Sequence, residues 1–352
     1  MIIPSFSARG GIATVVSGYK GSLLEQEYEI RYIETYVDGG KTAKLRKALS
    51  AYGKYLRMLL KWRPELVHVH VAFGPSFYRK TPFIWGAYIR KIPVVVHIHG
   101  SELDKFYSHA SKAKQRFVRK TFAACQRVIV LSDEWKRKFA NITDPEKVVV
   151  VQNYGIPSAE HARSAKSKMV LFLGFLSKAK GCLDIPDVAK IVNLQFPETY
   201  WVLAGSATPE EQRLLKEKIS ENKLQNRFVL PGWVQDEEKT ALLQSASVFF
   251  LPSYSEAMPM SVLEAMSWGL PIISTTVGGI PQLVKQKING YLIEPGDIDG
   301  FADRLKELLS NDTLRQTMGE QSLRFIKEYY SFDGHLQKIM AIYRQILENE
   351  KM

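Results

Sequence analysis

The chain has 352 residues, too many for one ordinary hydrophobic core, so we expect two domains of about 150 residues each. Hydrophobic residues make up 45% and charged residues 24%, which is ordinary for a globular protein in water. No apolar run approaches the roughly 18 residues of a membrane span, and the first residues lack the pattern of a secretory signal. We therefore expect no membrane-spanning helix.

The net charge of +12 comes from one half of the chain. Residues 1–157 hold 26 Lys and Arg against 12 Asp and Glu, whereas residues 158–352 hold 22 against 24. The first half therefore predicts an acidic partner. That partner is not expected to be nucleic acid, because aromatic residues do not interleave the basic clusters. The two cysteines, Cys125 and Cys182, fit neither a disulfide framework nor zinc-ligand spacing, which favours a reducing, cytoplasmic setting.

Strands and helices alternate through residues 1–157. We expect a very short strand at 1–4, followed by strands at 29–37, 66–71, 94–99, 127–131 and 148–152. The later strands are continuous β-branched runs, which are typical of a parallel sheet buried on both faces. Helices are predicted from Gly10 and Gly11 to about residue 24, over 41–63, near 82–90 and around 112–120. The polar segment 154–168 is interpreted as a linker.

The predicted helix at 41–63 contains eight Lys and Arg and no acidic residue. One face carries apolar residues at helical spacing: Leu45, Leu49, Tyr52, Leu56 and Leu59. We expect this face to pack on the sheet. The other face is basic: Arg46, Lys47, Lys54, Arg57 and Lys61. It is either simply solvated or contacts an anionic membrane surface through Lys47, Lys54, Arg57 and Lys61.

Residues 158–333 repeat the same alternation. Five strands are expected, at 169–175, 199–205, 227–232, 247–252 and 271–275. Helices are expected near 181–195, 209–222, 236–245, 259–268, 297–310 and 312–329, with a last one at 334–351. The predicted fold class is α/β, with two Rossmann-like doubly wound parallel-sheet domains that face each other across a cleft.

The stretch 251–274 carries the strongest functional signal. An apolar strand ends at Pro252, a loop carries Glu256, and Pro259 opens a helix that carries Glu264. Ligands of parallel sheets bind beyond the carboxyl ends of the strands, where a helix N-terminus binds anions such as a diphosphate. The predicted diphosphate-binding segment is Met258, Pro259, Met260 and Ser261. Glu264 could accept from two ribose hydroxyls, and Glu256 lies where an attached sugar would be, so the stretch predicts a nucleotide-sugar site.

The residues EAMPMSVLEAMSWGLPI, with Glu256 and Glu264 separated by seven residues, resemble the donor signature of retaining glycosyltransferases of family 4. The resemblance covers essentially the whole chain and implies the GT-B fold. It implies that residues 1–157 bind the acceptor and residues 158–333 the donor. It also implies that the last helix, 334–352, packs back on the first domain.

Further candidate site residues come from the same resemblance. His99, followed by Gly100 at a strand end, is similar to the family's His-Gly, whose His contacts the transferring sugar; a structural histidine is the alternative. His68, His70 and His97 are expected to lie in the core. Gly10 and Gly11 either approach the donor diphosphate or the acceptor, or form a simple turn.

The stretch LGFLSKAKG at 173–181 resembles the family's diphosphate-binding segment. Lys180 stands in the Lys position, but Phe175 replaces the usual Arg and removes a bidentate phosphate ligand, for which Lys178 is a possible substitute. Ala257 replaces the usual Gly after the first Glu. No metal site is expected, because Asp297 and Asp299, which have the Asp-x-Asp form, are explained by helix capping and first-turn charge.

The leading hypothesis is a cytoplasmic retaining glycosyltransferase that uses a nucleoside-diphosphate sugar as co-substrate and needs no metal or other cofactor. Its acceptor is expected to be lipid-linked or a saccharide, with the protein held at the inner face of an anionic membrane. Glu256 and His99 would position and stabilise the reacting sugar. The alternatives are a sugar-nucleotide epimerase of the same fold and a non-catalytic, membrane-docked module that binds nucleotide sugars. The identities of the sugar, the nucleoside and the acceptor are not predicted.

Overall fold

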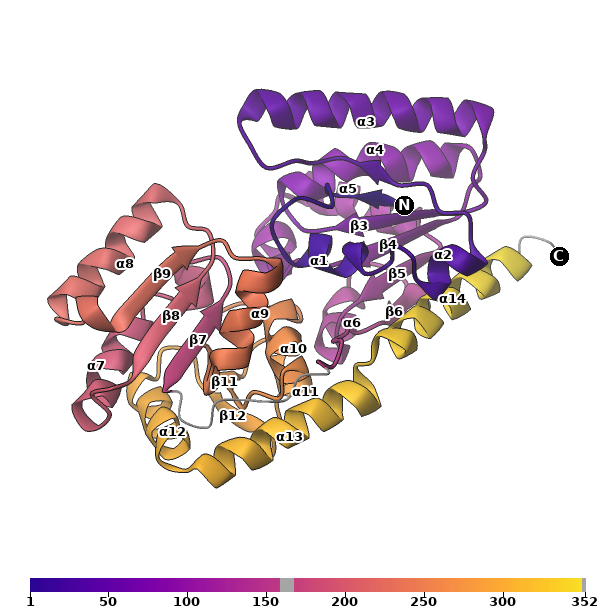
Figure 1. Ribbon diagram of the computed structural model, residues 1–352. Helices are drawn as coiled ribbons and strands as arrows, with labels where there is room; N and C mark the ends of the chain where they lie inside the picture. Colours follow the sequence, from indigo (N-terminus) through magenta and orange to yellow (C-terminus); the bar gives the residue numbers. More distant parts are fainter. Residues whose placement is uncertain (159–167, 350–352) are drawn as a thin grey trace. The chain divides into compact units, whose positions relative to one another are not determined.

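The computed structural model describes residues 1–158 and 168–349, which form two compact units (Figure 1). The first unit comprises Met1–Asn153 together with the chain from Phe332 onward, and the second comprises Tyr154–Ser331. Most of the predicted linker, 159–167, lies outside the described residues. No helix in the described ranges has the length and apolar character needed to cross a bilayer.

The first unit is built on a parallel sheet with strand order β2-β1-β3-β4-β5-β6. Its strands are β1 Ile2–Ile3, β2 Ile33–Glu34, β3 Val67–Val71, β4 Val94–Ile98, β5 Arg127–Val130 and β6 Val148–Val150. The helices are α1 Gly11–Ser17, α2 Leu23–Glu27, α3 Lys41–Lys61, α4 Pro75–Ile89, α5 Lys112–Ala123, α6 Asp133–Phe139 and α14 Phe332–Asn349. The α/β fold class with a parallel sheet is confirmed, and β3 and β4 are buried along their whole length.

The last helix, α14, is part of this first unit. Its Tyr343 hydroxyl lies 2.6 Å from His68 Nδ1 on β3, and its His335 Nε2 lies 2.8 Å from the Tyr19 hydroxyl. His335 Nδ1 also hydrogen-bonds the carbonyl of Gln152 at 2.7 Å. The far end of the chain therefore completes the core around β3.

Three predicted elements of the first unit have different bounds in the structure. The helix expected from Gly10 to about residue 24 is interrupted after Ser17, because Gly21 adopts φ +69° and Ser22 starts a new helix by accepting from Leu24 N. The strand expected at 29–37 shrinks to β2. Helix α4 starts at Pro75, seven residues before its predicted start at Pro82. Proline is well suited to the first position of a helix, where its missing N–H would have no partner within the helix. Pro82 lies inside the helix.

The predicted inward face of α3 was right for Leu59, which is buried, and for Tyr52, which is half-buried, but wrong for the other three leucines. Ala48, Ala51, Tyr55 and Leu59 are the buried side chains of α3. The leucines at 45, 49 and 56, predicted to pack on the sheet, are exposed. The physical reason is that α3 packs beside α4: the Tyr52 and Tyr55 hydroxyls donate to the α4 carbonyls of Arg79 and Phe83, each at 2.7 Å. Small alanines allow this close approach, so the leucines remain outside.

The second unit has the parallel sheet order β12-β11-β10-β7-β8-β9. Its strands are β7 Met169–Leu173, β8 Tyr200–Ala204, β9 Phe228–Gly232, β10 Val248–Leu251, β11 Ile272–Thr275 and β12 Gly290–Ile293. Its helices are α7 Ile185–Gln195, α8 Pro209–Glu221, α9 Asp236–Ser245, α10 Met260–Ser267, α11 Ile280–Leu283, α12 Ile298–Ser310 and α13 Asp312–Tyr329. The sequence prediction missed β12, whose four residues start at a glycine and are flanked by polar residues.

Candidate functional site

The central feature of the second unit is an ion pair beyond the carboxyl end of β10. The Glu256 carboxylate is buried, with 6% of its side chain exposed, and its Oε1 accepts from Lys180 Nζ at 2.5 Å. Lys180 comes from the turn after β7, a strand that pairs with β10. A buried charge needs such a partner, since an unpaired carboxylate would be costly to remove from water. The fold therefore brings Lys180 and Glu256, which the sequence analysis predicted from two separate motifs, into direct contact.

The turn that carries Lys180 is fastened to the loop that follows β10. Tyr254 N donates to Ala179 O at 2.9 Å, and Ser253 Oγ donates to the same carbonyl at 3.1 Å. Gly181 adopts φ +70°, and a Cβ there would lie 2.0 Å from Pro252 O. Only glycine allows this approach, so the final residue of the motif at 173–181 serves to press the Lys180 turn against the Glu256 loop.

A second loop holds Glu256 from the other side. Gly278 and Gly279 follow β11, the other strand paired with β10. A Cβ on Gly278, at φ +60°, would lie 1.8 Å from Glu256 O, and Gly279 N donates to Ala257 O at 2.8 Å. The sequence analysis did not single out this pair, although a Gly-Gly two residues after a predicted buried strand was the signal that could have revealed it.

Helix α10 begins beside Glu256. Pro259 is the residue that precedes the helix, with φ −70° and ψ 124°, so α10 starts at Met260, one residue later than predicted. Met258 and Pro259 are buried and Met260 and Ser261 are partly exposed. The first N–H groups of an α-helix have no partner within the helix and carry its positive dipole end. This helix end can accept an anion next to the Lys180–Glu256 pair.

Glu264 lies one turn into α10 and has a lysine partner of its own. Its Oε1 accepts from Lys239 Nζ, on α9, at 2.7 Å, and both side chains are partly buried. Lys239 was not among the predicted site residues, and its position in α9 gave no sequence signal. The Glu264 carboxylate keeps acceptor capacity for a further ligand, because an ionised carboxylate can accept about four hydrogen bonds.

The structure also places the residues at which this chain departs from the family pattern. Phe175, in the usual Arg position, is 43% exposed. Lys178, considered as its substitute, is exposed in the turn before Lys180, and Ala257 is buried next to Glu256. Asp297 Oδ1 accepts from Gly300 N at 2.9 Å and caps α12, as its sequence context predicted.

In the first unit, His99 directly follows β4. His99 N donates to Val71 O at 2.8 Å, and its ring Nε2 lies 3.0 Å from His70 Nδ1. Burial lowers the pKa of His99 to about 3, with the charges of Lys80 and His335 acting in the same direction. The ring is therefore neutral near pH 7 and can donate from one nitrogen while it accepts at the other.

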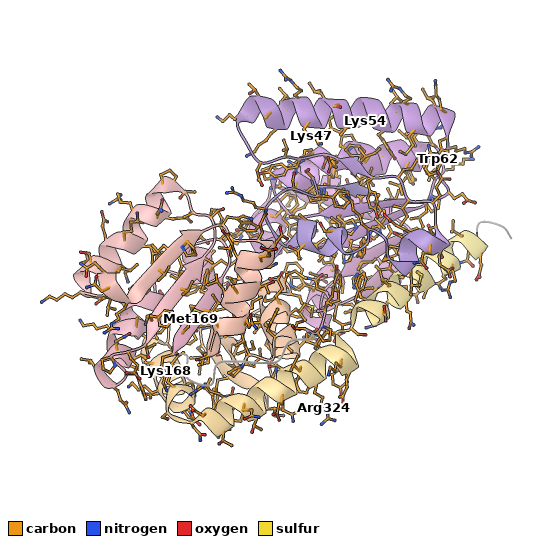
Figure 2. All side chains as sticks on the ribbon, in the orientation of Figure 1. Lys47, Lys54, Trp62, Lys168, Met169 and Arg324 are labelled. Atoms are coloured by element: carbon orange, nitrogen blue, oxygen red, sulfur yellow. The ribbon has the colours of Figure 1, made fainter. Side chains whose placement is uncertain are left out.

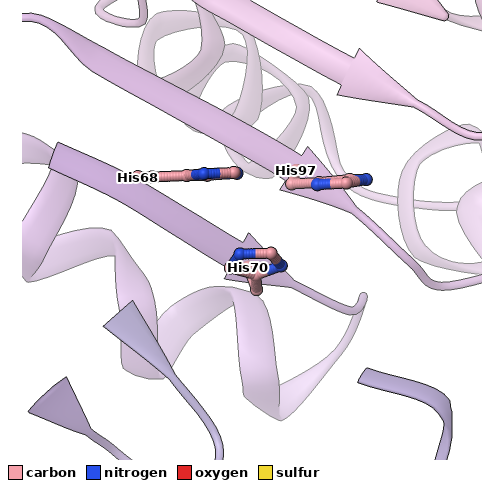
Figure 3. Close-up of side chains that lie close together, drawn as sticks. All are labelled: His68, His70 and His97. Atoms are coloured by element: carbon pink, nitrogen blue, oxygen red, sulfur yellow. The ribbon is translucent and has the colours of Figure 1, made fainter. Parts of the chain in front are cut away.

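His99 is the end of a stack of buried imidazoles. His68, His70 and His97 lie in the core, as predicted, with nitrogens within 4.8 Å of one another (Figure 3). The His68 and His70 rings are stacked at 4.3 Å with planes 24° apart, so their in-plane lone pairs do not converge as tetrahedral zinc requires. The fully buried Lys80, whose Nζ donates to His70 O, further disfavours a cation there. This arrangement favours a packed core over a metal centre.

The Gly10-Gly11 turn opens α1. Gly10 adopts φ +123°, which requires glycine, and nothing lies within 4 Å of the position its Cβ would take. The backbone before it is held by Arg9 N, which donates to Asp38 Oδ2 at 2.7 Å. The turn thus presents an open, shaped backbone surface that a ligand could approach.

The family comparison matches both units. Residues 3–154 match the profile described as Glycosyltransferase Family 4, and residues 157–325 match the one described as Glycosyl transferases group 1. The chain belongs to glycosyltransferase family 4. The six-stranded parallel sheets of its two units are those of the GT-B fold, as the sequence resemblance implied.

One sequence relative agrees with that assignment, and two solved structures share the fold of this chain. It is 27% identical over 330 residues to the UDP-Gal:alpha-D-GlcNAc-diphosphoundecaprenol alpha-1,3-galactosyltransferase of Escherichia coli, covering 88% of this chain and 83% of that one. Sucrose-phosphate synthase from Thermosynechococcus elongatus has a TM-score of 0.75 at 19% identity, with 91% and 84% of the two chains covered. Anabaena HepE, solved in complex with UDP-glucose, has a TM-score of 0.74 at 19% identity, with 98% and 91% covered.

Proposed function

We propose that this glycosyltransferase moves a sugar from a uridine-diphosphate sugar to a lipid-linked saccharide, with retention of the anomeric configuration. The observation that carries the proposal is the buried Glu256 in contact with Lys180, beside the N-terminus of α10. UDP-sugars are the donor class to test first, because the E. coli relative is named for UDP-Gal and HepE was solved with UDP-glucose.

Each part of the site has a distinct proposed role. Lys180 and the segment Met258–Ser261 would neutralise the donor diphosphate, with the helix dipole adding to the lysine charge. Glu264 would accept from the ribose hydroxyls, oriented by Lys239. When Lys180 turns to the diphosphate, Glu256 would be released to contact the sugar. The ion pair would therefore keep both residues in place until the donor arrives.

The proposed reaction is a front-side displacement. The bond between the anomeric carbon and the diphosphate oxygen breaks, and a bond to the acceptor oxygen forms on the same face. The acceptor proton passes to the leaving diphosphate, so no separate base is required. Glu256 would stabilise positive charge on the sugar ring, and neutral His99 would hydrogen-bond a sugar hydroxyl.

We infer that the reaction needs no divalent metal. Lys180 and the α10 N-terminus supply the positive charge that a metal would otherwise bring to the leaving group. Among the described residues, the one group of three possible ligands is the histidine stack of the first unit, whose rings are stacked rather than convergent.

The acceptor is proposed to be lipid-linked, with the enzyme peripheral on the inner face of the membrane. The E. coli relative is named for a diphosphoundecaprenol acceptor, and the net charge of the first half suits an anionic surface. Of the four basic residues predicted to meet that surface, Lys54, Arg57 and Lys61 are exposed. Lys47 Nζ instead pairs with Glu34 Oε2 at 2.5 Å, so its charge is engaged within the protein.

The test is an assay with purified protein, UDP-galactose or UDP-glucose, and a polyprenyl-diphosphate-linked sugar. We expect UDP release that depends on the acceptor, a product with α-linkage by NMR, and unchanged turnover in EDTA. An inverted linkage would refute retention, and loss of turnover in EDTA with recovery in manganese would refute metal independence. Binding without turnover would favour the non-catalytic module, and conversion of the donor without an acceptor would favour the epimerase.

A further inference from the structure

Helix α3 carries an exposed stripe of leucines. Leu45, Leu49, Leu56 and Leu60 are 62%, 60%, 59% and 65% exposed. Their spacings of four, seven and four residues place them on one face of the helix. Single exposed leucines are common, but four aligned on one helix form a continuous apolar surface of the kind that marks an interaction site.

The stripe continues onto α4. The two helices run side by side in the same direction, because Tyr52 and Tyr55 bond α4 at Arg79 and Phe83, and Leu59 lies against Gly86. Figure 1 shows α3 and α4 as neighbouring helices of the first unit. Exposed apolar residues of α4 extend the surface. We call the combined surface the apolar ridge, formed by Leu45, Leu49, Leu56, Leu60, Tyr78 (43% exposed) and Ile89 (75% exposed).

The charge around the apolar ridge has a single sign. Helices α3, α4 and α5 together contain fourteen Lys and Arg and no Asp or Glu. On α3, Arg46, Lys54, Arg57 and Lys61 are exposed beside the leucines; Figure 2 shows Lys54 on this helix. On α5, which packs against the other side of α4, Arg116 and Lys120 are exposed. The ridge is therefore flanked by cations on two sides.

We propose that the apolar ridge inserts into the interface of an anionic lipid bilayer. An amphipathic helix with leucines on one face and Lys and Arg beside them lies in the plane of a membrane, with its apolar side chains among the acyl chains and its cations at the headgroups. Tyrosine suits the same depth, because its ring is apolar and its hydroxyl is polar. A second copy of this chain fits the surface poorly, since two faces without a carboxylate would repel each other.

This proposal deepens the peripheral membrane location given under Proposed function. It assigns the contact to inserted leucines as well as to lysines, so attachment should persist in part when salt screens the charges. Vesicle binding can be measured without donor or acceptor, and sugar transfer can be measured on a water-soluble acceptor analogue. Failure of one proposal is therefore distinguishable from failure of the other.

The experiment places a fluorophore on the ridge. Leu49→Cys is labelled with an environment-sensitive dye and mixed with vesicles of equal parts phosphatidylglycerol and phosphatidylcholine. Cys125 and Cys182 are buried, and the unsubstituted chain measures their residual labelling. The matched control is Ser50→Cys, exposed on the same helix but turned by about 100° from Leu49. We expect a blue shift and quenching by brominated lipid at position 49 and much smaller changes at position 50.

A second pair of variants tests binding strength. Leu49→Gln with Leu56→Gln should lower the vesicle partition coefficient in 0.5 M NaCl at least tenfold. Leu194→Gln with Ile288→Gln, which change exposed apolar residues of the second unit, should leave the coefficient unchanged. Transfer to a soluble acceptor should be unaffected by either pair.

Three results would overturn the proposal. One is binding of the labelled Leu49→Cys protein to vesicles without a blue shift of the dye, which would mean that charge alone holds the protein on the bilayer surface. Another is equal binding to vesicles of pure phosphatidylcholine. The third is a lipid-free dimer, seen by sedimentation velocity, that Leu49→Gln dissociates, because a second copy would then cover the ridge.

Discussion

Substitutions in the Glu264–Lys239 pair test the proposed contact between Glu264 and the donor ribose. The pair is partly buried and its atoms lie 2.7 Å apart. We expect Glu264→Ala to raise the dissociation constant for the donor at least tenfold, because hydrogen bonds to charged groups contribute about 1.5–3 kcal/mol each. Lys239→Met should have a smaller effect, since it removes only the group that orients the carboxylate. Isothermal titration calorimetry with UDP measures both constants.

The control for this prediction is another carboxylate–lysine pair of the second unit. Asp187 Oδ2 accepts from Lys218 Nζ at 2.6 Å, and both side chains are about 40% exposed. Asp187→Ala removes a pair of similar geometry that joins α7 to α8 and involves none of the proposed donor-binding residues, so it should leave the affinity for UDP unchanged. An unchanged UDP affinity in Glu264→Ala would remove the ribose assignment.

At the scale of elements, the position of Glu256 depends on two glycine-containing loops. Gly278→Ala combines a positive φ with a Cβ 1.8 Å from Glu256 O, so the backbone of the Glu256 loop must move. We expect a lower melting temperature and a loss of turnover of at least tenfold. Gly232→Ala is the matched control: its φ is +83°, but nothing lies within 4 Å of its Cβ, so it imposes backbone strain alone. Circular dichroism and the transfer assay compare the two variants; equal effects would argue against positioning of Glu256 by Gly278.

The elements also show what could be predicted from sequence. Long β-branched runs predicted β3 and β4 well, because burial on both faces imposes a composition visible in one chain. Only part of the inward face of α3, at Tyr52 and Leu59, could be predicted, because the rest depends on the Tyr55 bond to α4 and on alanines that allow close approach. The pairing of Glu264 with Lys239 was equally hidden, since α9 and α10 meet only in the folded chain.

At the scale of the whole molecule, the two units should respond differently to acid. The first unit holds four buried histidines, with the partly exposed His99 beside them, whereas the described part of the second unit contains no histidine. Burial lowers the pKa of His99 to about 3 and that of His335 to about 4. Burial also holds the pKa values of His68, His70 and His97 well below the usual value. The first unit is thus folded around neutral imidazoles.

The consequence is a loss of stability as the pH falls below about 6.5. In that range the unfolded chain binds protons that the folded chain does not, so the free energy of unfolding falls with pH by about 1.4 kcal/mol per pH unit for each such histidine. Five histidines acting together would exhaust a typical stability of 5–15 kcal/mol within a few pH units. We expect the first unit to unfold between about pH 4 and 6, before the second, and hydrogen exchange at a series of pH values would follow the two units separately.

One substitution tests the origin of this acid sensitivity. Both ring nitrogens of His97 are buried without a hydrogen-bond partner in the described part of the chain. His97→Leu should therefore raise stability near pH 5 and reduce the slope of stability against pH by about one proton, because the unfolded chain then has one fewer site to protonate. The control is Val69→Ala, on the neighbouring strand β3. It should lower the free energy of unfolding by the same amount at every pH, and therefore leave the slope of stability against pH unchanged. If His97→Leu leaves the slope as it is in the unsubstituted protein, the buried histidines do not determine the acid response.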